Sequence, residues 1–268
     1  NALNNFTSQS GTFGYSGISY TYQLVRDASN TNQLDVLVGS CRMIDATSGG
    51  YNLTGSECTV VNAGTTVTNL SGSAITIANN SVVGSFSNAG TVGNSGATNG
   101  ILINNATLTS GLTNTGLING TTYGIAVTNG GNITSLTNSG TITGATAAIE
   151  VQGSTITNLN NAGSIAGATA LDLASATLAS GLTNTGVISG TSYGINLASS
   201  TITGTLTNSG SISGATAIKF ASTTVTGDVA NSGTITGTNA GINLASASLG
   251  GNINNAGVIN GGSYAIAL

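Results

Sequence analysis

Few residues of this 268-residue chain carry groups that could do chemistry. Cys41 and Cys58 lie close together near the N-terminus, and Glu150 and Asp172 are separated by about one sequence repeat. Histidine is absent. Without an imidazole the chain has neither a Ser-His-Asp or Cys-His nucleophile nor a histidine metal ligand. We therefore expect a non-catalytic protein with no cofactor and no metal site.

The two cysteines are predicted to form a disulfide. A bond that closes so short a loop stabilises a fold by ~3 kcal/mol in the chain-entropy model, and it requires an oxidising compartment. A pair of free buried thiols is the alternative. Cys41 and Cys58 are too few to hold a metal ion by themselves.

The composition limits the partners of the chain. Its three basic residues, Arg26, Arg42 and Lys219, are too few to neutralise a phosphate backbone, so nucleic acid is not expected as a partner.

The sequence has no signal of a membrane segment. No apolar run approaches the ~20 residues of a membrane-spanning helix, and the first residues do not have the pattern of a secretory leader. With 39% hydrophobic and 4% charged residues, the chain is able to bury a core. We expect a mature, soluble protein.

An internal repeat organises most of the sequence. Asn-x-Gly recurs nine times in steps of 23–26 residues, and an apolar residue follows two positions after eight of the nine glycines. Apolar and small polar residues alternate within each repeat, which is typical of strands with one buried face. Three short strands per repeat cannot bury their faces alone, but stacked coils can. The sequence therefore predicts an all-β solenoid of about nine coils.

The asparagines of the repeat are predicted to stack as a ladder that bonds coil to coil. Its members are Asn62, Asn88, Asn114, Asn138, Asn161, Asn184, Asn208, Asn231 and Asn255.

A longer period is superimposed on the single repeat. Residues 112–181 align with residues 182–252, and Tyr123, Tyr193 and Tyr264 recur every three coils. The array therefore reads as a duplicated three-coil cassette.

Two domains are expected. Residues 1–60 lack the repeat, contain the cysteines and much of the charge, and are predicted to form an N-terminal β-rich cap. A cap protects the unpaired edge of a terminal coil. Residues 61–268 form the β-solenoid repeat region.

One outward column of the predicted solenoid carries charge. Strand alternation directs Glu150 and Asp172 outward on neighbouring coils, about one strand spacing apart. Such a pair suits polysaccharide cleavage or calcium binding. However, we expect no Arg, His or Tyr beside it to hold a sugar, which favours solvated surface charges. The column reads Ala126, Glu150, Asp172, Asn196, Lys219, Asn243 and Ala267.

The unit L-x-N-x-G-x-I-x-G, as in LTNSGTITG at 136–144 and LTNSGSISG at 206–214, resembles repeats of bacterial autotransporter passengers and filamentous-haemagglutinin-like adhesins. The resemblance covers roughly residues 60–268. It implies a right-handed, three-sided parallel β-helix and export to the surface of a Gram-negative bacterium. It also implies roles in adhesion, aggregation or biofilm formation. No catalytic residue of the family maps onto this chain.

Two functions follow as expectations. The first is an adhesin passenger that contacts host or neighbouring cells, with polysaccharide binding or cleavage through Glu150 and Asp172 as the alternative. The second is a fibre subunit, in which an uncapped last coil with Tyr264, Ile266 and Leu268 stacks head-to-tail on another copy. A fragment of a longer chain is the other explanation of the uncapped last coil, although stacking is favoured.

Overall fold

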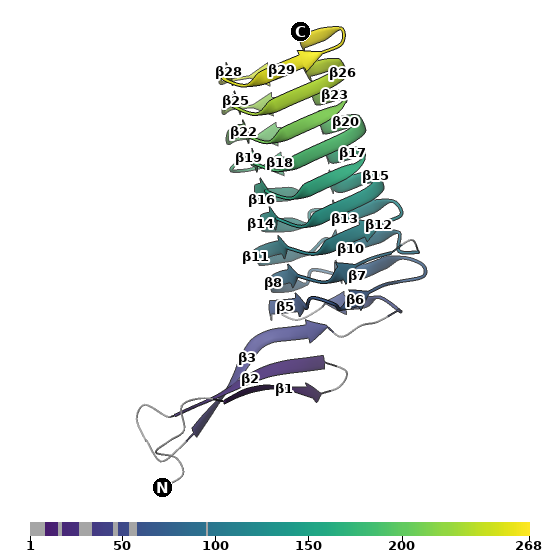
Figure 1. The fold of residues 1–268 in the computed structure, drawn as a ribbon, viewed down its shortest axis with the longest axis vertical. Coiled ribbons are helices and arrows are strands. Elements are labelled where there is room, and N and C mark those ends of the chain that lie inside the picture. The colour runs from purple at the N-terminus through teal and green to yellow at the C-terminus, as the bar shows by residue number, and fades with distance from the viewer. Residues whose placement is uncertain (1–8, 16–17, 27–33, 45–47, 54–57, 95) are drawn as a thin grey trace.

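The computed structural model describes residues 9–15, 18–26, 34–44, 48–53, 58–94 and 96–268. These residues form strands and turns, and no helix occurs among them. Accordingly, the described part of the chain has no helix that could span a bilayer. Figure 1 shows the coils stacked along the long axis of the molecule, with the N-terminal strands at one end and the C-terminus at the other.

Two long sheets make up the walls of the shaft. The first sheet has 16 strands, and its main path runs from the N-terminal strands through one short strand of every coil. Its members are β1 (Gln9–Tyr15), β2 (Ile18–Arg26), β3 (Leu34–Ile44), β5 (Cys58–Val61), β8 (Val82–Asn88), β11 (Thr107–Asn114), β14 (Asn132–Asn138), β16 (Thr155–Asn161), β18 (Thr177–Leu178), β19 (Leu182–Asn184), β21 (Thr201–Ile202), β22 (Leu206–Asn208), β24 (Thr224–Val225), β25 (Val229–Asn231), β27 (Ser248–Leu249) and β28 (Ile253–Asn255).

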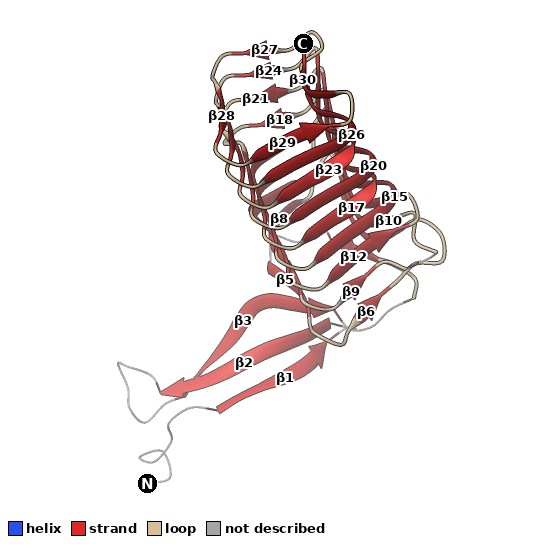
Figure 2. Ribbon diagram, turned by 45° about the horizontal axis from the view of Figure 1, so that its top comes forward, coloured by secondary structure: helices blue, strands red, loops and turns tan. Residues whose placement is uncertain are grey.

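The second sheet has 14 strands. Its members are β4 (Tyr51–Leu53), β6 (Thr66–Val67), β7 (Ser73–Ala78), β9 (Thr91–Val92), β10 (Asn99–Asn104), β12 (Leu117–Gly120), β13 (Tyr123–Thr128), β15 (Thr141–Gln152), β17 (Ser164–Ala174), β20 (Val187–Ala198), β23 (Ser211–Ala221), β26 (Thr234–Asn243), β29 (Val258–Gly261) and β30 (Tyr264–Ala267). Figure 2 shows the long strands β15, β17, β20 and β23 side by side on one wall of the shaft.

The core is a set of stacked apolar columns that run along the shaft. Equivalent isoleucines of successive coils pair in parallel register, and each of them is fully buried. Removing a side chain of this size from water contributes roughly 1.5–3 kcal/mol. Stacking therefore supplies the burial that one coil lacks. One such column consists of Ile142, Ile165, Ile188, Ile212 and Ile235.

The predicted fold class is confirmed: the protein is a parallel β-solenoid of about nine coils. At its N-terminal end, β1, β2 and β3 pair antiparallel, and β3 then pairs in parallel with β5. β4 already pairs in parallel with β7 of the next coil. The predicted boundary between residues 60 and 61 stays a prediction, since both sheets begin before it.

Each coil turns one corner through a left-handed residue. Asn105 and Asn129 have φ of 49° and 54°, whereas Ser175, Ser199 and Ser222 have φ of 51°, 52° and 50°. The corners of consecutive coils are also linked, because the Ser175 N–H donates to the carbonyl of Ala198 and the Ser199 N–H to that of Ala221. The left-handed region is costly for most L-residues and less so for asparagine, so the serine corners carry avoidable strain.

Replacing the corner serine by asparagine, as in Ser199→Asn, should therefore stabilise the solenoid. We expect the free energy of unfolding to rise by about 0.5 kcal/mol, because asparagine tolerates this backbone conformation better than serine. Urea unfolding followed by circular dichroism measures the change. Thr183→Asn is the matched control, because Thr183 lies exposed in strand β19 and pairs with Asn160 of the preceding coil. An equal gain in both variants would contradict the explanation.

Candidate functional site

The outer side of the second sheet carries most of the charge of the repeat region. Residues 96–268 contain four charged residues, and three of them, Glu150, Asp172 and Lys219, lie in one outward column. The register pairs Glu150 with Asp172, Asp172 with Asn196, and Asn196 with Lys219. The predicted column is thus present on strands β15, β17, β20 and β23. We call this wall, with its neighbouring outward columns, the charged face.

The two carboxyl groups lie on adjacent coils and affect each other. Burial, the charge of Asp172 and a hydrogen bond between the two side chains raise the pKa of Glu150 from 4.5 to about 7. The Asn196 side-chain nitrogen donates to Asp172 Oδ1 at 2.8 Å. The Asn196 amide oxygen is buried and has no hydrogen-bond partner among the described residues. Glu150 therefore keeps its proton to a higher pH than an ordinary glutamate does.

Tyrosines flank the charged column, contrary to the sequence-based expectation that no Tyr lies beside the acidic pair. Burial, together with the charges of Glu150 and Asp172, raises the pKa of Tyr123, so its hydroxyl lies within electrostatic reach of both carboxyl groups. One cassette later, Lys219 Nζ lies 4.8 Å from the centroid of the Tyr193 ring. Counting in steps of two from Ile125 or Ile195 would direct both tyrosines inward, so strand alternation alone does not place them beside the carboxyl pair.

The pairing of the long strands is irregular just before the tyrosine column. The pairing of β17 with β20 shifts between Gly167 and Thr169, and that of β20 with β23 shifts between Ser189 and Tyr193. Such irregularities re-aim side chains in a strand. The recurrence of tyrosine every three coils was the signal in the sequence that marked this column.

Small residues fill the tyrosine column between the rings. Ala147, Thr169, Thr216 and Ala240 occupy the coils between Tyr123, Tyr193 and Tyr264, and all four are buried although they do not belong to the apolar core cluster. Aromatic rings thus alternate with small positions along the charged face.

The charged face offers groups that could bind a partner. Carboxyl groups, an amide, an ammonium group and aromatic rings are suited to polar ligands or to another protein surface. Among the described residues no three His, Cys, Asp or Glu side chains gather as metal ligands.

The asparagine ladder runs through the first sheet from Asn88 to Asn255. Each side-chain nitrogen donates to the amide oxygen of the asparagine one coil further, at 2.7–2.8 Å. Asn184, for example, accepts from Asn161 and has the carbonyls of Gly186 and Ser211 at 3.2 and 3.1 Å from its nitrogen. The amides therefore join coil to coil and satisfy turn carbonyls.

The glycine two positions after each ladder asparagine allows the coils to stack closely. A Cβ atom on Gly186 would lie 2.2 Å from the carbonyl oxygen of Gly163, and one on Gly210 would lie 2.1 Å from that of Gly186. No side chain fits at these distances. Asn-x-Gly is consequently one structural unit, in which the amide bonds the coils and the glycine lets them approach.

Asn62 is a correction to the predicted ladder. The register pairs Asn88 with Val61, which is fully buried, while Asn62 is exposed. Gly64 has a φ of 80° and no atom within 4 Å of an added Cβ, unlike the later repeat glycines. The first Asn-x-Gly is therefore shifted by one residue out of the ladder, because an apolar side chain occupies the inward position.

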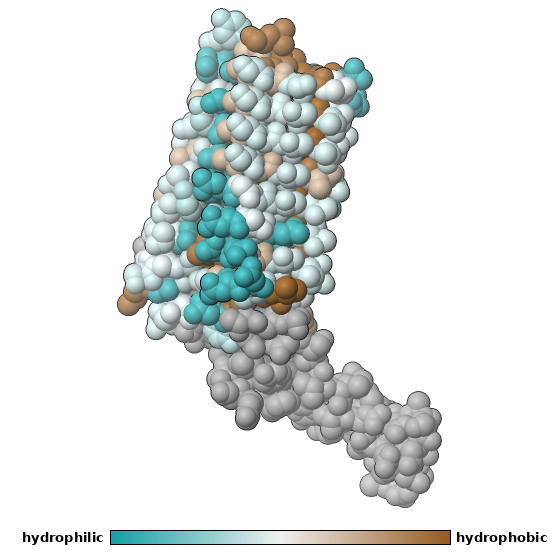
Figure 3. Space-filling model, turned by 180° about the vertical axis from the view of Figure 1, so that it is seen from behind, coloured by the Kyte–Doolittle hydropathy of each residue, from teal (hydrophilic) through white to brown (hydrophobic). Residues whose placement is uncertain are grey.

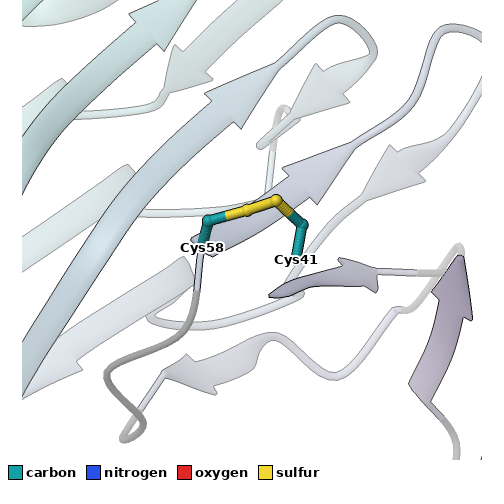
Figure 4. Close-up of a disulfide and its surroundings, with 2 residues drawn as sticks. All are labelled: Cys41 and Cys58. Atoms are coloured by element: carbon teal, nitrogen blue, oxygen red, sulfur yellow. A yellow bond between two sulfur atoms is a disulfide. The ribbon is translucent and has the colours of Figure 1, made fainter. Parts of the chain in front are cut away.

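The disulfide joins the N-terminal strands to the solenoid. Cys41 of β3 and Cys58 of β5 are direct partners in the parallel register, with their Cα atoms 4.3 Å apart, and they form the predicted bond (Figure 4). It closes a loop of 17 residues in sequence separation at the first coil.

The last coil exposes apolar side chains. Tyr264, Ile266 and Leu268 are 61%, 40% and 100% exposed, and Figure 3 shows hydrophobic surface at this end of a shaft that is otherwise mostly neutral to hydrophilic on the face shown. In the parallel register, Ile266 of β30 pairs with Ile242 of the preceding coil.

The ladder predicts a sharp difference between Asn184→Ala and Asn62→Ala. Loss of the buried Asn184 amide removes the acceptor of Asn161, the donor to Asn208 Oδ1 and a bond to the Ser211 carbonyl, so the free energy of unfolding should fall by about 3 kcal/mol. Asn62→Ala, at an exposed Asn-x-Gly outside the ladder, should change it by less than about 0.5 kcal/mol. Urea unfolding with hydrogen exchange of the adjacent coils measures both. Equal losses would refute the structural role of the ladder.

The raised pKa of Glu150 predicts the sign of a pH effect. The folded state keeps its proton to higher pH than the unfolded chain, so the free energy of unfolding should fall as pH rises from about 4.5 to about 7. We expect this contribution to be about 1 kcal/mol, because solvent screens a partly exposed carboxyl group. Glu150→Gln should remove this part of the pH dependence. Identical pH profiles of the two proteins would contradict a raised pKa of Glu150 in the folded state.

Comparison of the chain with family models, curated proteins and solved structures finds no match. Of what the resemblance of the repeat unit implied, the structure shows the parallel β-solenoid.

Proposed function

We propose that this protein is a non-catalytic, extracellular shaft of the bacterial surface with an adhesive or fibre-forming role. The observation that carries the proposal is the uninterrupted coil-to-coil bonding of the repeat region, in which the Asn88–Asn255 ladder parallels the stacked core. A structure in which every coil repeats the same contacts extends in one direction, and this regular extension supports the role of a shaft.

The length of the shaft suits a spacer whose outer walls can also contact other molecules. At about 4.8 Å per coil, the eight steps of the repeat region span roughly 40 Å. The outer columns of such a shaft place similar side chains at regular intervals, which suits many weak contacts with another surface in place of one deep pocket.

The disulfide supports an extracellular location. Cys41 and Cys58 bond across the first coil, and disulfides persist in oxidising compartments such as the cell surface. The resemblance of the repeat to autotransporter passengers and filamentous-haemagglutinin-like adhesins points to the same place. Roles in adhesion, aggregation and biofilm formation follow from that resemblance.

Two measurements on the purified full chain test the proposal. Negative-stain electron microscopy should show rods, and filaments many times longer than one rod would favour the fibre-forming role. Beads coated with the protein should aggregate or attach to cell layers more than beads coated with albumin. Both roles would be contradicted if microscopy showed only isolated rods and if the coated beads behaved like the albumin control.

A polysaccharide-directed function is the second candidate, and the position of Tyr123 beside the carboxyl pair favours it. Aromatic rings and carboxyl groups on one outer wall can stack against and bond to sugars. Release of reducing ends from surface polysaccharides that Glu150→Gln and Asp172→Asn both abolish would support this candidate. Absence of release and of binding to a polysaccharide panel would eliminate it.

A further inference from the structure

The order of groups along the charged face makes the column self-complementary. On consecutive coils the column presents Glu150, Asp172, Asn196 and Lys219, that is, acid, acid, amide and base. Glu150 and Lys219 are three coils apart, about 14 Å, which is too far for an ion pair within the chain. A second copy can be turned end for end about the midpoint between Asp172 and Asn196 and laid against the first. In this arrangement acidic groups face basic or amide groups. Glu150 then faces Lys219 of the second copy, and Asp172 faces its Asn196.

The same rotation also keeps the tyrosine rings of the two copies apart. It places Tyr193 opposite the small position Thr169 of the second copy, and Tyr123 opposite its Ala240. No ring therefore meets another ring along the six coils from Tyr123 to Ala240, so the tyrosine column is compatible with the register that pairs the charges.

The third outward column is equally compatible with this register. It consists of Gln152, Ala174, Ala198 and Ala221, which pair in order on consecutive coils. The long side chain of Gln152 faces Ala221 of the second copy, and Ala174 faces Ala198. Small residues on both sides let the two walls approach.

We propose that two copies of this chain associate side by side and antiparallel through their charged faces, with Glu150 of each copy paired to Lys219 of the other. Parallel association of the same faces in register would bring Glu150 against Glu150 and Asp172 against Asp172, which like-charge repulsion disfavours. The interface is isologous, so it closes with two copies.

The expected strength is that of a weak, reversible contact. Six coils of three columns cover about 30 Å by 20 Å, so the pair buries roughly 1,000–1,200 Å² in total, at the lower end of specific interfaces. Charge pairing then controls both orientation and affinity. The pairing rests on the proposed adhesive role and makes it more specific, because it names a second copy of the chain as the partner of the charged face.

A charge exchange tests the pairing in solution. Sedimentation velocity of the full chain at low salt and about pH 8 should show a concentration-dependent dimer that about 0.5 M salt dissociates. Lys219→Glu and Glu150→Lys should each weaken the dimer by about tenfold or more. The double variant Glu150→Lys with Lys219→Glu restores opposite charges across the two-fold axis and should return to within about threefold of the original affinity.

The control is Thr207→Glu, which introduces a charge on β22 of the first sheet and should leave the dimer unchanged. A monomeric wild-type chain, or a double variant as weak as the single ones, would overturn the proposal. Circular dichroism of each variant separates loss of pairing from loss of folding. Sedimentation reports on pairing alone, whereas the bead assay reports on adhesion, so the two proposals can fail independently.

Cysteine cross-linking tests the orientation. A mixture of Ala174→Cys and Ala198→Cys proteins should form a disulfide-linked heterodimer under mild oxidation, because the two positions face each other only in the antiparallel pair. Each variant alone should cross-link much less. Efficient cross-linking of Ala174→Cys with itself would refute the antiparallel pair in the proposed register.

Discussion

Coil-to-coil stacking is the interaction on which the rest of this structure depends. A coil of 23–26 residues is too short to bury its inner face or to satisfy its backbone alone, so each coil folds only against its neighbours. The asparagine ladder and the close approach of the repeat glycines are two consequences of this constraint. Both act where the chain turns, at the place where strand pairing would otherwise leave amides and carbonyls unsatisfied.

The same constraint separates the interior of the shaft from its outer faces. Inward positions keep one residue type from coil to coil, apolar in the isoleucine column beginning at Ile142 and asparagine in the ladder, whereas outward positions vary. Glu150 and Lys219 occupy neighbouring copies of the repeated cassette and carry opposite charges. The two cassettes thus share one scaffold and differ in the charges that their outer faces carry.

The N-terminal strands show how a solenoid can begin. β3 leaves an antiparallel meander and pairs in parallel with β5, and the Cys41–Cys58 bond fixes this change of direction. The first Asn-x-Gly is displaced by one residue at the same place, since Val61 takes the inward position that asparagine holds in later coils. Regular stacking is established only from Asn88 onward.

The sequence by itself determined the period, the strand content and the solenoid, because stacked coils require the same residue types at the same interval. It also indicated the cysteine pair, the outward column from Glu150 to Lys219 and the ladder from Asn88 to Asn255. Only the tertiary structure decided that Asn62 stands outside the ladder and that Tyr123 and Tyr193 lie beside the charged column. A shift of one residue reverses the direction of a side chain in a strand, and such shifts arise from packing between coils that no local pattern records.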